Sequence, residues 1–295
     1  MTNSPFSLRI FVADGDPDGL RLIERSNWIG KAVVFPRAIY PKIRTRDQFK
    51  QTGVYLLMGP RADGDGEMRY VGEGDPVGPR LESHYANKDF WTQALFFIAG
   101  NGLLNKAHVQ YLESRLVARG FAAKRVKMDN AVKPTEPTLS EADRADMDVF
   151  LSHILGMLPV LGIHAFEKSG TAAVAIDDAL LTCQGRGALA RGRDTTQGFV
   201  VMAGSQIAVD EVPSLQKYFP NISQLRTELR ESGVIGQDGA VFKFTEDYTF
   251  NSPSMASSFV LGSSSNGRTD WKDSEGRTLK EIQSAQIGPS GNQTT

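Results

Sequence analysis

Two short apolar runs, joined by a segment with two Asp-Gly pairs, constrain the fold of this chain most strongly. Residues 53–58 (GVYLLM) are rich in strand-forming side chains, and residues 68–72 (MRYVG) form a second such run. The segment between them, PRADGDGE, contains two Asp-Gly dipeptides, the strongest short-range signal for a β-hairpin. The sequence therefore predicts an antiparallel pair of strands that carries Tyr55 on one strand and Tyr70 on the other.

A helix is predicted directly after this hairpin. Asp75 and Pro76 are typical of a helix start, because Asp caps the free N–H groups and Pro suits the first helical position. The helix carries Arg80 and His84, which are four residues apart and hence on one helix face. Residues 92–99 (TQALFFIA) then read as a third, buried strand.

A second helix is predicted over residues 105–120. Its apolar residues Val109, Leu112 and Leu116 recur at helical spacing, and Glu113 lies in or beside their stripe. A carboxylate in that place needs a partner, because burying an unpaired charge is strongly unfavourable.

The charge balance argues against a globally basic nucleic-acid-binding protein. The chain has 33 Lys and Arg against 34 Asp and Glu, so its net charge is −1. Any DNA contact must therefore come from a local basic cluster. Cys183 is the single cysteine. It allows no intrachain disulfide and favours a cytoplasmic setting, and neither a signal peptide nor a membrane span is expected.

The two tyrosine motifs resemble the paired tripeptides of the GIY-YIG nuclease family, which includes homing endonucleases, restriction enzymes and a nuclease subunit of bacterial excision repair. They are Gly53-Val54-Tyr55 and Tyr70-Val71-Gly72. In that family an Arg follows the second tyrosine, often with a His one turn later, and a later helix carries one Glu. Arg80, His84 and Glu113 match this order. The resemblance covers residues 50–165, with a longer segment between the tripeptides than is usual and Val in place of Ile in the first.

The resemblance implies an α+β fold with a small antiparallel three-stranded central sheet flanked by helices. Residues 8–40 and 252–282 also resemble segments of bacterial family members that carry an appended C-terminal domain of unknown function. The resemblance therefore implies the same order of domains here. The expected parts are an N-terminal β lead (1–45), a nuclease domain (46–167), a C-terminal α+β accessory domain (168–284) and a flexible tail (285–295).

The activity implied by the resemblance is Mg²⁺- or Mn²⁺-dependent hydrolysis of phosphodiester bonds in DNA. Glu113 would hold the metal ion, and Arg80 would grip the scissile phosphate. Tyr55 or Tyr70 would position or deprotonate the attacking water, and His84 could relay its proton. Which tyrosine acts as the base is left open.

Further DNA contacts are expected outside this group. The family often has an Asn after the Glu helix, and Asn130 is the nearest candidate. A basic stretch contributes Arg186, Arg191 and Arg193, either as DNA contacts or as a solvated hairpin.

Three rival interpretations remain at the level of sequence. The tyrosines could be ordinary strand aromatics and Glu113 a structural carboxylate paired with a lysine. The chain could be a non-catalytic module that binds DNA or a protein partner. It could also be a toxin or phage-defence nuclease.

A nuclease with a single active site would need to form a homodimer, or to meet the DNA a second time, to cut both strands of a duplex. A homodimer is therefore one possible oligomeric state.

Overall fold

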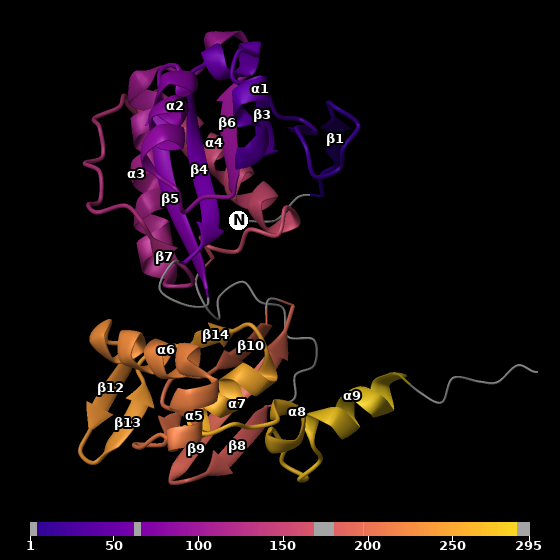
Figure 1. Cartoon of the computed structure of the whole chain (residues 1–295), viewed down its shortest axis with the longest axis vertical. Helices are drawn as coiled ribbons and strands as arrows, with labels where there is room; N and C mark the ends of the chain where they lie inside the picture. Colours follow the sequence, from indigo (N-terminus) through magenta and orange to yellow (C-terminus); the bar gives the residue numbers. More distant parts are fainter. Residues whose placement is uncertain (1–4, 62–65, 168–179, 197, 288–295) are drawn as a thin grey trace, which may run out of the picture. The chain divides into compact units, whose positions relative to one another are not determined.

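The computed structural model of the chain describes residues 5–61, 66–167, 180–196 and 198–287. The chain divides into two compact units, residues 1–168 and residues 169–295. Each unit has its own sheet, helices and hydrophobic core (Figure 1). None of the helices in the described ranges is long and apolar enough to cross a membrane.

The first unit is built on a seven-stranded sheet with the strand order β1-β2-β3-β6-β4-β5-β7. Neighbouring strands pair antiparallel, except that β7 pairs with β5 in parallel. The strands are β1 (Leu8–Val12), β2 (Arg21–Arg25), β3 (Gly30–Pro36), β4 (Gly53–Pro60), β5 (Glu67–Gly74), β6 (Gln93–Ala99) and β7 (Lys127–Met128).

Helices cover both faces of this sheet, and α3 runs alongside β5 (Figure 1). The helices are α1 (Tyr40–Ile43), α2 (Val77–Asn87), α3 (Lys106–Ala123) and α4 (Glu141–Val160). Three single turns of 3₁₀-helix connect the larger elements, namely η1 (Arg37–Ile39), η2 (Asp47–Lys50) and η3 (Gly100–Gly102).

Strand β4 is buried on both faces, which explains its continuous apolar sequence. Val54 and Leu56 belong to a core shared with α3 and α4. Tyr55 and Leu57 belong to a second core shared with α1, η2 and α2. Each fully buried aliphatic side chain of this kind contributes about 1.5–3 kcal/mol to folding. The two cores therefore fix α2 and α3 on opposite faces of the same strands.

The predicted fold class was wrong about the size of the sheet and about the C-terminal part. The first unit has seven strands instead of a small three-stranded central sheet. Strands β1 to β3, predicted as a separate lead, continue that sheet, because β3 pairs with β6 from Gly30 opposite Ala99 to Pro36 opposite Gln93. The second unit has a seven-stranded sheet and a core of its own, so it is not a minor accessory.

The burial of β6 gives the physical reason for this larger sheet. Every residue from Ala94 to Ala99 is buried. A strand buried in this way must find partners for the backbone N–H and C=O groups on both of its edges. Strand β4 satisfies one edge and β3 satisfies the other. The second partner comes from much earlier in the chain, which a local sequence pattern does not reveal.

The hairpin prediction is confirmed. Strands β4 and β5 pair antiparallel from Gly53 opposite Gly74 to Pro60 opposite Glu67. Residues 62–65 of the predicted turn lie outside the described residues. The start of α2 differs from the prediction, because Pro76 is the N-cap residue. The carboxylate of Asp75 instead accepts a hydrogen bond from the Thr52 hydroxyl at 2.5 Å.

The described part of the second unit also contains seven strands, in the order β12-β13-β11-β9-β10-β14 with β8 paired to β9. The strands are β8 (Leu181–Gly185), β9 (Ala188–Thr195), β10 (Gly198–Val201), β11 (Gln206–Ile207), β12 (Ile235–Asp238), β13 (Val241–Phe244) and β14 (Tyr248–Phe250). The helices are α5 (Pro213–Tyr218), α6 (Pro220–Glu231), α7 (Pro253–Leu261), α8 (Gly267–Asp270) and α9 (Leu279–Ile287).

Aromatic packing and one buried charge organise the core of the second unit. The rings of Trp271 and Phe199 lie 4.4 Å apart, centroid to centroid. Arg226 is fully buried and forms an ion pair with Glu211 at 3.0 Å. Its guanidinium also donates hydrogen bonds to two backbone carbonyls, of Ala208 and Phe259. These partners offset the cost of removing the charge from water.

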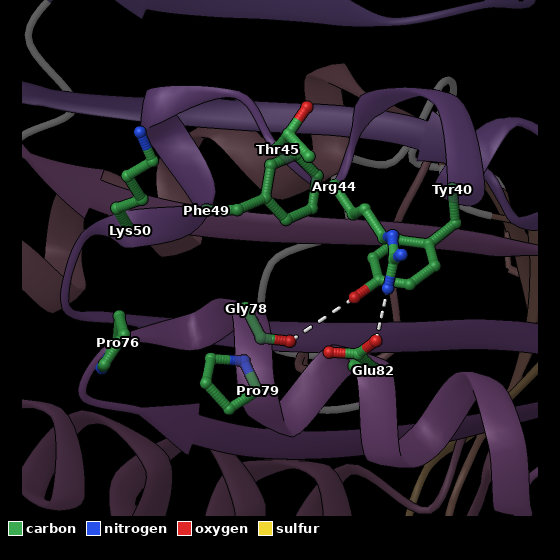
Figure 2. A pocket seen from close by; sticks show the side chains of 9 residues that line it. All are labelled: Tyr40, Arg44, Thr45, Phe49, Lys50, Pro76, Gly78, Pro79 and Glu82. Carbon is green, nitrogen blue, oxygen red and sulfur yellow. Dashed lines mark hydrogen bonds and ion pairs between the residues drawn. The ribbon is translucent and has the colours of Figure 1, made fainter.

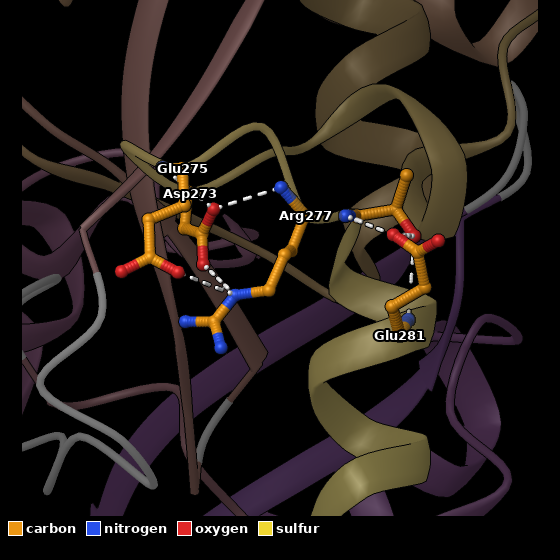
Figure 3. Close-up of polar contacts among 5 residues, drawn as sticks. Asp273, Glu275, Arg277 and Glu281 are labelled. Atoms are coloured by element: carbon orange, nitrogen blue, oxygen red, sulfur yellow. Dashed lines mark hydrogen bonds and ion pairs between the residues drawn. The ribbon is translucent and has the colours of Figure 1, made fainter.

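A polar turn leads into α9 (Figure 3). The guanidinium of Arg277 donates to Asp273 at 2.8 Å. The carboxylate of Glu281 accepts from the backbone N–H of Thr278 at 2.8 Å, and the Thr278 hydroxyl accepts from the Glu281 N–H at 3.3 Å. This reciprocal pattern is a capping box, which fixes where the helix begins.

Candidate active site

The pairing of β4 with β5 places both tyrosines on one face of the sheet. Tyr55 lies opposite Gly72, and Leu57 lies opposite Tyr70. Since Tyr55 and Leu57 are two residues apart, they share a face with the residues opposite them. The two tyrosine rings are diagonal neighbours, with centroids 6.3 Å apart. Tyr55 is completely buried, whereas Tyr70 is partly exposed.

Gly72 leaves the space that the Tyr55 ring occupies. A Cβ atom on Gly72 would lie 2.4 Å from both Cζ and Oη of Tyr55, much closer than a real contact allows. The glycine of the second tripeptide is therefore needed so that the phenol can lie across β5.

We expect Gly72→Ala to displace the Tyr55 phenol. The clash should lower the free energy of unfolding by about 1–3 kcal/mol. It should also reduce the activity proposed below by about 100-fold, because a shift of about 1 Å at a reacting group has that effect. Thermal unfolding and cleavage rates measure the two changes. Gly100→Ala is the matched control, since its Cβ would meet nothing closer than 4.0 Å. Equal rates and melting temperatures for Gly72→Ala and the wild type would contradict this role.

Helix α2 brings His84 and Arg80 to the two tyrosines. The Nε2 atom of His84 lies 2.8 Å from the phenolic oxygen of Tyr55. The His84 ring also packs edge-on against the Tyr70 ring, with centroids 4.9 Å apart. Arg80 is exposed and lies near the Tyr55 phenol, where its positive charge lowers the pKa of that phenol. The four side chains thus form one group between β4, β5 and α2.

Helix α3 contributes Glu113 from the opposite face of the sheet. The apolar stripe of α3 packs into the core, and Glu113 lies half-buried beside it. Within the described part of the chain, the Glu113 carboxylate has no hydrogen bond and no ion pair. Burial, followed by the negative charge of Glu73, raises the pKa of Glu113 to about 7, while Arg80 and Lys106 oppose the rise. The carboxylate is therefore available for a cation.

The electrostatic environment keeps the ring groups of this site uncharged near neutral pH. Burial raises the pKa of the Tyr55 phenol, and the nearby Tyr70 adds to the shift, whereas Arg80 lowers it. Burial and then Glu113 raise the pKa of Tyr70. Burial, with the charges of Lys88 and Arg80, lowers the pKa of His84 to about 4. A neutral imidazole can accept the hydrogen bond of a protonated phenol.

Two ion pairs that sequence reasoning missed flank the group. Lys106 of α3 contacts both carboxylate oxygens of Glu73, at 2.6 and 2.8 Å. Lys88 donates to Asp129 at 2.5 Å, and its ammonium lies 4.7 Å from the centre of the Tyr70 ring. Lys88 could have been found from the sequence, because it follows His84 by one helical turn. The approach of Asp129 depends on a loop whose course the sequence pattern does not indicate.

Asn130 does not join the group through its side chain. Its amide oxygen accepts from the Val71 N–H at 3.0 Å, and its amide nitrogen donates to the Val71 carbonyl at 2.8 Å. The buried side chain therefore continues the pairing of β7 with β5. In the structure, the Asn130 side chain is a hydrogen-bond partner of the β5 backbone.

The three arginines of the basic stretch lie in the second unit, on a β-hairpin. Arg186 occupies the turn between β8 and β9, and its guanidinium is 3.5 Å from the carbonyl oxygen of Asp210. Arg191 and Arg193 lie on β9, where Arg191 is exposed and Arg193 is partly buried. The stretch is thus an ordered hairpin.

The donor set around Glu113 suits a hard divalent cation that keeps most of its water ligands. The described residues contain no group of three or more His, Cys, Asp and Glu side chains placed to hold a metal. Mg²⁺, however, is often bound by one or two carboxylates together with substrate phosphates. The carboxylate of Glu113 has no other partner among the described residues, and the neighbouring charge of Glu73 disfavours its ionised form. Both properties fit a cation at Glu113.

The comparisons with known proteins concern the second unit. Residues 181–283 match the model of a family described as a domain of unknown function, DUF4357. No curated protein and no solved structure matches the chain. The matched region begins after the unit that contains Tyr55, His84 and Glu113.

Proposed function

We propose that residues 1–168 form a metal-dependent endonuclease unit that hydrolyses phosphodiester bonds in DNA. The observation that carries the proposal is the convergence of Tyr55, Tyr70, Arg80 and His84 in one group, with Glu113 within electrostatic reach. These side chains come from four separate elements. The proposed setting is the cytoplasm, which the single cysteine favours.

Arg80 would bind the scissile phosphate. The residue is exposed, so a phosphate in solution can reach it. The planar fork can donate two parallel hydrogen bonds to phosphate oxygens, which both orients the group and stabilises the charge that grows on it.

Glu113 would hold the divalent cation at the same phosphate. A bound Mg²⁺ or Mn²⁺ supplies Lewis-acid stabilisation of the phosphate and makes its bound water more acidic. Glu113 must lose its proton to bind the cation, so its raised pKa links activity to pH.

The two tyrosines would have different roles. Tyr70 is partly exposed and can contact the attacking water. Tyr55 is completely buried and contacts His84 at 2.8 Å, so it would orient that side chain. The low pKa of His84 keeps its imidazole neutral, so it can accept a hydrogen bond from the Tyr55 phenol. The raised pKa of Tyr70 makes its phenol a positioning group until a nearby cation lowers that pKa.

A cleavage assay tests this function. The purified full-length chain is incubated with Mg²⁺ or Mn²⁺ and supercoiled plasmid, single-stranded DNA or branched DNA. We expect at least one substrate to be cut. Binding of DNA without cutting of any substrate would support a non-catalytic module instead. Toxicity on induced expression that disappears in Arg80→Ala would point to a toxin or defence role for the same chemistry.

The rate of cleavage is expected to rise with pH through about 7 at low Mg²⁺ concentration. Below the pKa of Glu113, protons compete with the cation for the carboxylate. Raising the Mg²⁺ concentration should move this acid limb to lower pH, because more cation displaces the proton. Rates measured across pH at several metal concentrations show the shift. If the acid limb stays at the same pH at every Mg²⁺ concentration, the titrating group is one that does not bind the metal.

A further inference from the structure

A second feature of the first unit is a pocket on the other flank of α2 (Figure 2). Arg44, Phe49 and Lys50 of α1, η2 and the adjoining residues form one wall, and Pro79 and Glu82 of α2 form the other. Its volume is 360 Å³, within the range of about 300–1,000 Å³ that is usual for ligand sites. The sequence had indicated only a basic and polar connection in this part of the chain.

The charge around this pocket is unlike that of the whole chain. Residues 37–50, which include one wall of the pocket, contain five Lys or Arg and one Asp, and Glu82 adds a negative charge on the other wall. The side chains of Arg44 and Lys50 are 49% and 69% exposed, and in the free protein each forms a surface ion pair, Arg44 with Glu82 and Lys50 with Asp47 at 2.8 Å. Lys42 and Arg46 are exposed on the same segment. The N-terminus of α2, with its positive dipole end, also faces the pocket.

The pocket and the candidate active site both use residues of helix α2. Pro79 lines the pocket, and the next residue, Arg80, lies near the Tyr55 phenol and lowers its pKa. Consecutive Cα atoms are about 3.8 Å apart, so α2 carries the pocket wall and the phosphate-binding arginine on adjoining positions. A polyanion bound at Arg80 can therefore extend over the start of α2 into the pocket.

We propose that this pocket binds the phosphodiester backbone of the DNA strand next to the scissile phosphate. The proposal rests on the proposed nuclease function. Arg44 and Lys50 would contact phosphates, which supplies affinity without sequence preference. Strongly exposed cations on an open rim suit a passing polyanion better than an enclosed small ligand. Glu82 and Asp47 oppose this binding, because their carboxylates pair with Arg44 and Lys50 in the free protein.

The test is a titration of fluorescein-labelled duplex DNA of random sequence with the full-length chain, in chelator so that metal-dependent cleavage is prevented. Anisotropy is measured at several salt concentrations. We expect Arg44→Ala/Lys50→Ala to weaken binding by about 10-fold and to reduce the salt slope by about 1.8, the value for two lost phosphate contacts. Arg9→Ala/Lys31→Ala removes the same charge from β1 and β3 and should leave the slope nearly unchanged.

A second variant is expected to strengthen DNA binding, which shows that weaker binding by Arg44→Ala/Lys50→Ala is not caused by a loss of folding. Glu82→Gln frees Arg44 and should tighten DNA binding several-fold, which damage to the fold would not do. The proposal is overturned if Arg44→Ala/Lys50→Ala binds DNA like the wild type, or if both double variants weaken binding equally. Failure of the nuclease function looks different. In that case the wild type binds DNA with the expected dependence on Arg44 and Lys50, yet cuts nothing when Mg²⁺ is supplied.

Discussion

Glu113→Gln is expected to lower the single-turnover rate of DNA cleavage by about 10³-fold. Gln has nearly the same shape as Glu but lacks the negative charge that a hard cation requires. Losing a cation that stabilises the charge on the phosphate raises the barrier by several kcal/mol, and each 1.36 kcal/mol is a factor of ten in rate. Calorimetric titration with Mn²⁺ should show the matching loss of metal binding.

The same substitution should stabilise the metal-free protein, and this separates its effect from misfolding. Burial raises the pKa of Glu113 from 4.5 to about 7, so the folded state holds the proton more tightly than the unfolded state. Stability is therefore lost as pH rises from about 4.5 to about 7. Glu113→Gln removes this loss and should add about 1–2 kcal/mol at pH 8, after allowance for solvent screening, and little at pH 4. Urea unfolding at both pH values measures it.

Glu141→Gln is the matched control for these experiments. Glu141 is exposed in the first turn of α4 and takes no part in the group around Tyr55. It should leave cleavage unchanged and alter stability by no more than about 1 kcal/mol. Cleavage by Glu113→Gln at the wild-type rate would remove Glu113 from the site.

Arg80→Ala is expected to reduce cleavage by about 10²–10³-fold, because it removes the donors aimed at the phosphate. Arg80 is exposed, so the free energy of unfolding should change by no more than about 0.5 kcal/mol. Arg80→Lys should recover only part of the activity, since a point charge lacks the planar fork. Stopped time courses at saturating Mg²⁺ give the rates.

The pH dependence of Arg80→Ala provides a second readout. Arg80 lowers the pKa of Glu113, so its removal should raise that pKa further. The acid limb of cleavage at low Mg²⁺ should therefore move to higher pH in Arg80→Ala. Arg119→Ala, on the exposed side of α3, should leave both the rate and the acid limb as they are in the wild type. An unshifted limb in Arg80→Ala would mean that Arg80 does not act on Glu113.

Local sequence patterns predicted the helices and strands that carry the site. The rest of the sheet depends on pairing between strands that are far apart in the sequence. The Asp-Gly pairs indicated the β4–β5 hairpin, and helical spacing indicated α3 with Glu113 at the border of its buried stripe. Strand β3 joins β6 from much earlier in the chain, so the seven-stranded sheet could not be read from either segment alone. This non-local pairing is why the expected three-stranded sheet was wrong.

The candidate site was likewise predicted from the sequence only in part. The family resemblance supplied Tyr55, Tyr70 and Glu113, and the four-residue spacing indicated that Arg80 and His84 share a face of α2. The contact of His84 with the Tyr55 phenol needed the structure, since it depends on how α2 packs on β4 and β5. Two side chains near this group were not predicted, Glu73 beside Glu113 and Lys88 over Tyr70. Glu73 belongs to no recognisable motif, whereas the spacing of Lys88 from His84 would have indicated its position.

The most direct test of the central claim is the metal dependence of DNA cleavage by the full-length chain. Wild type and Glu113→Gln are first treated with chelator, and Mg²⁺ or Mn²⁺ is then added back in excess. The proposed function predicts no cleavage in chelator, restored cleavage in the wild type, and none in Glu113→Gln. Intact DNA under every condition, equal cleavage with and without chelator, or restored cleavage in Glu113→Gln would contradict it.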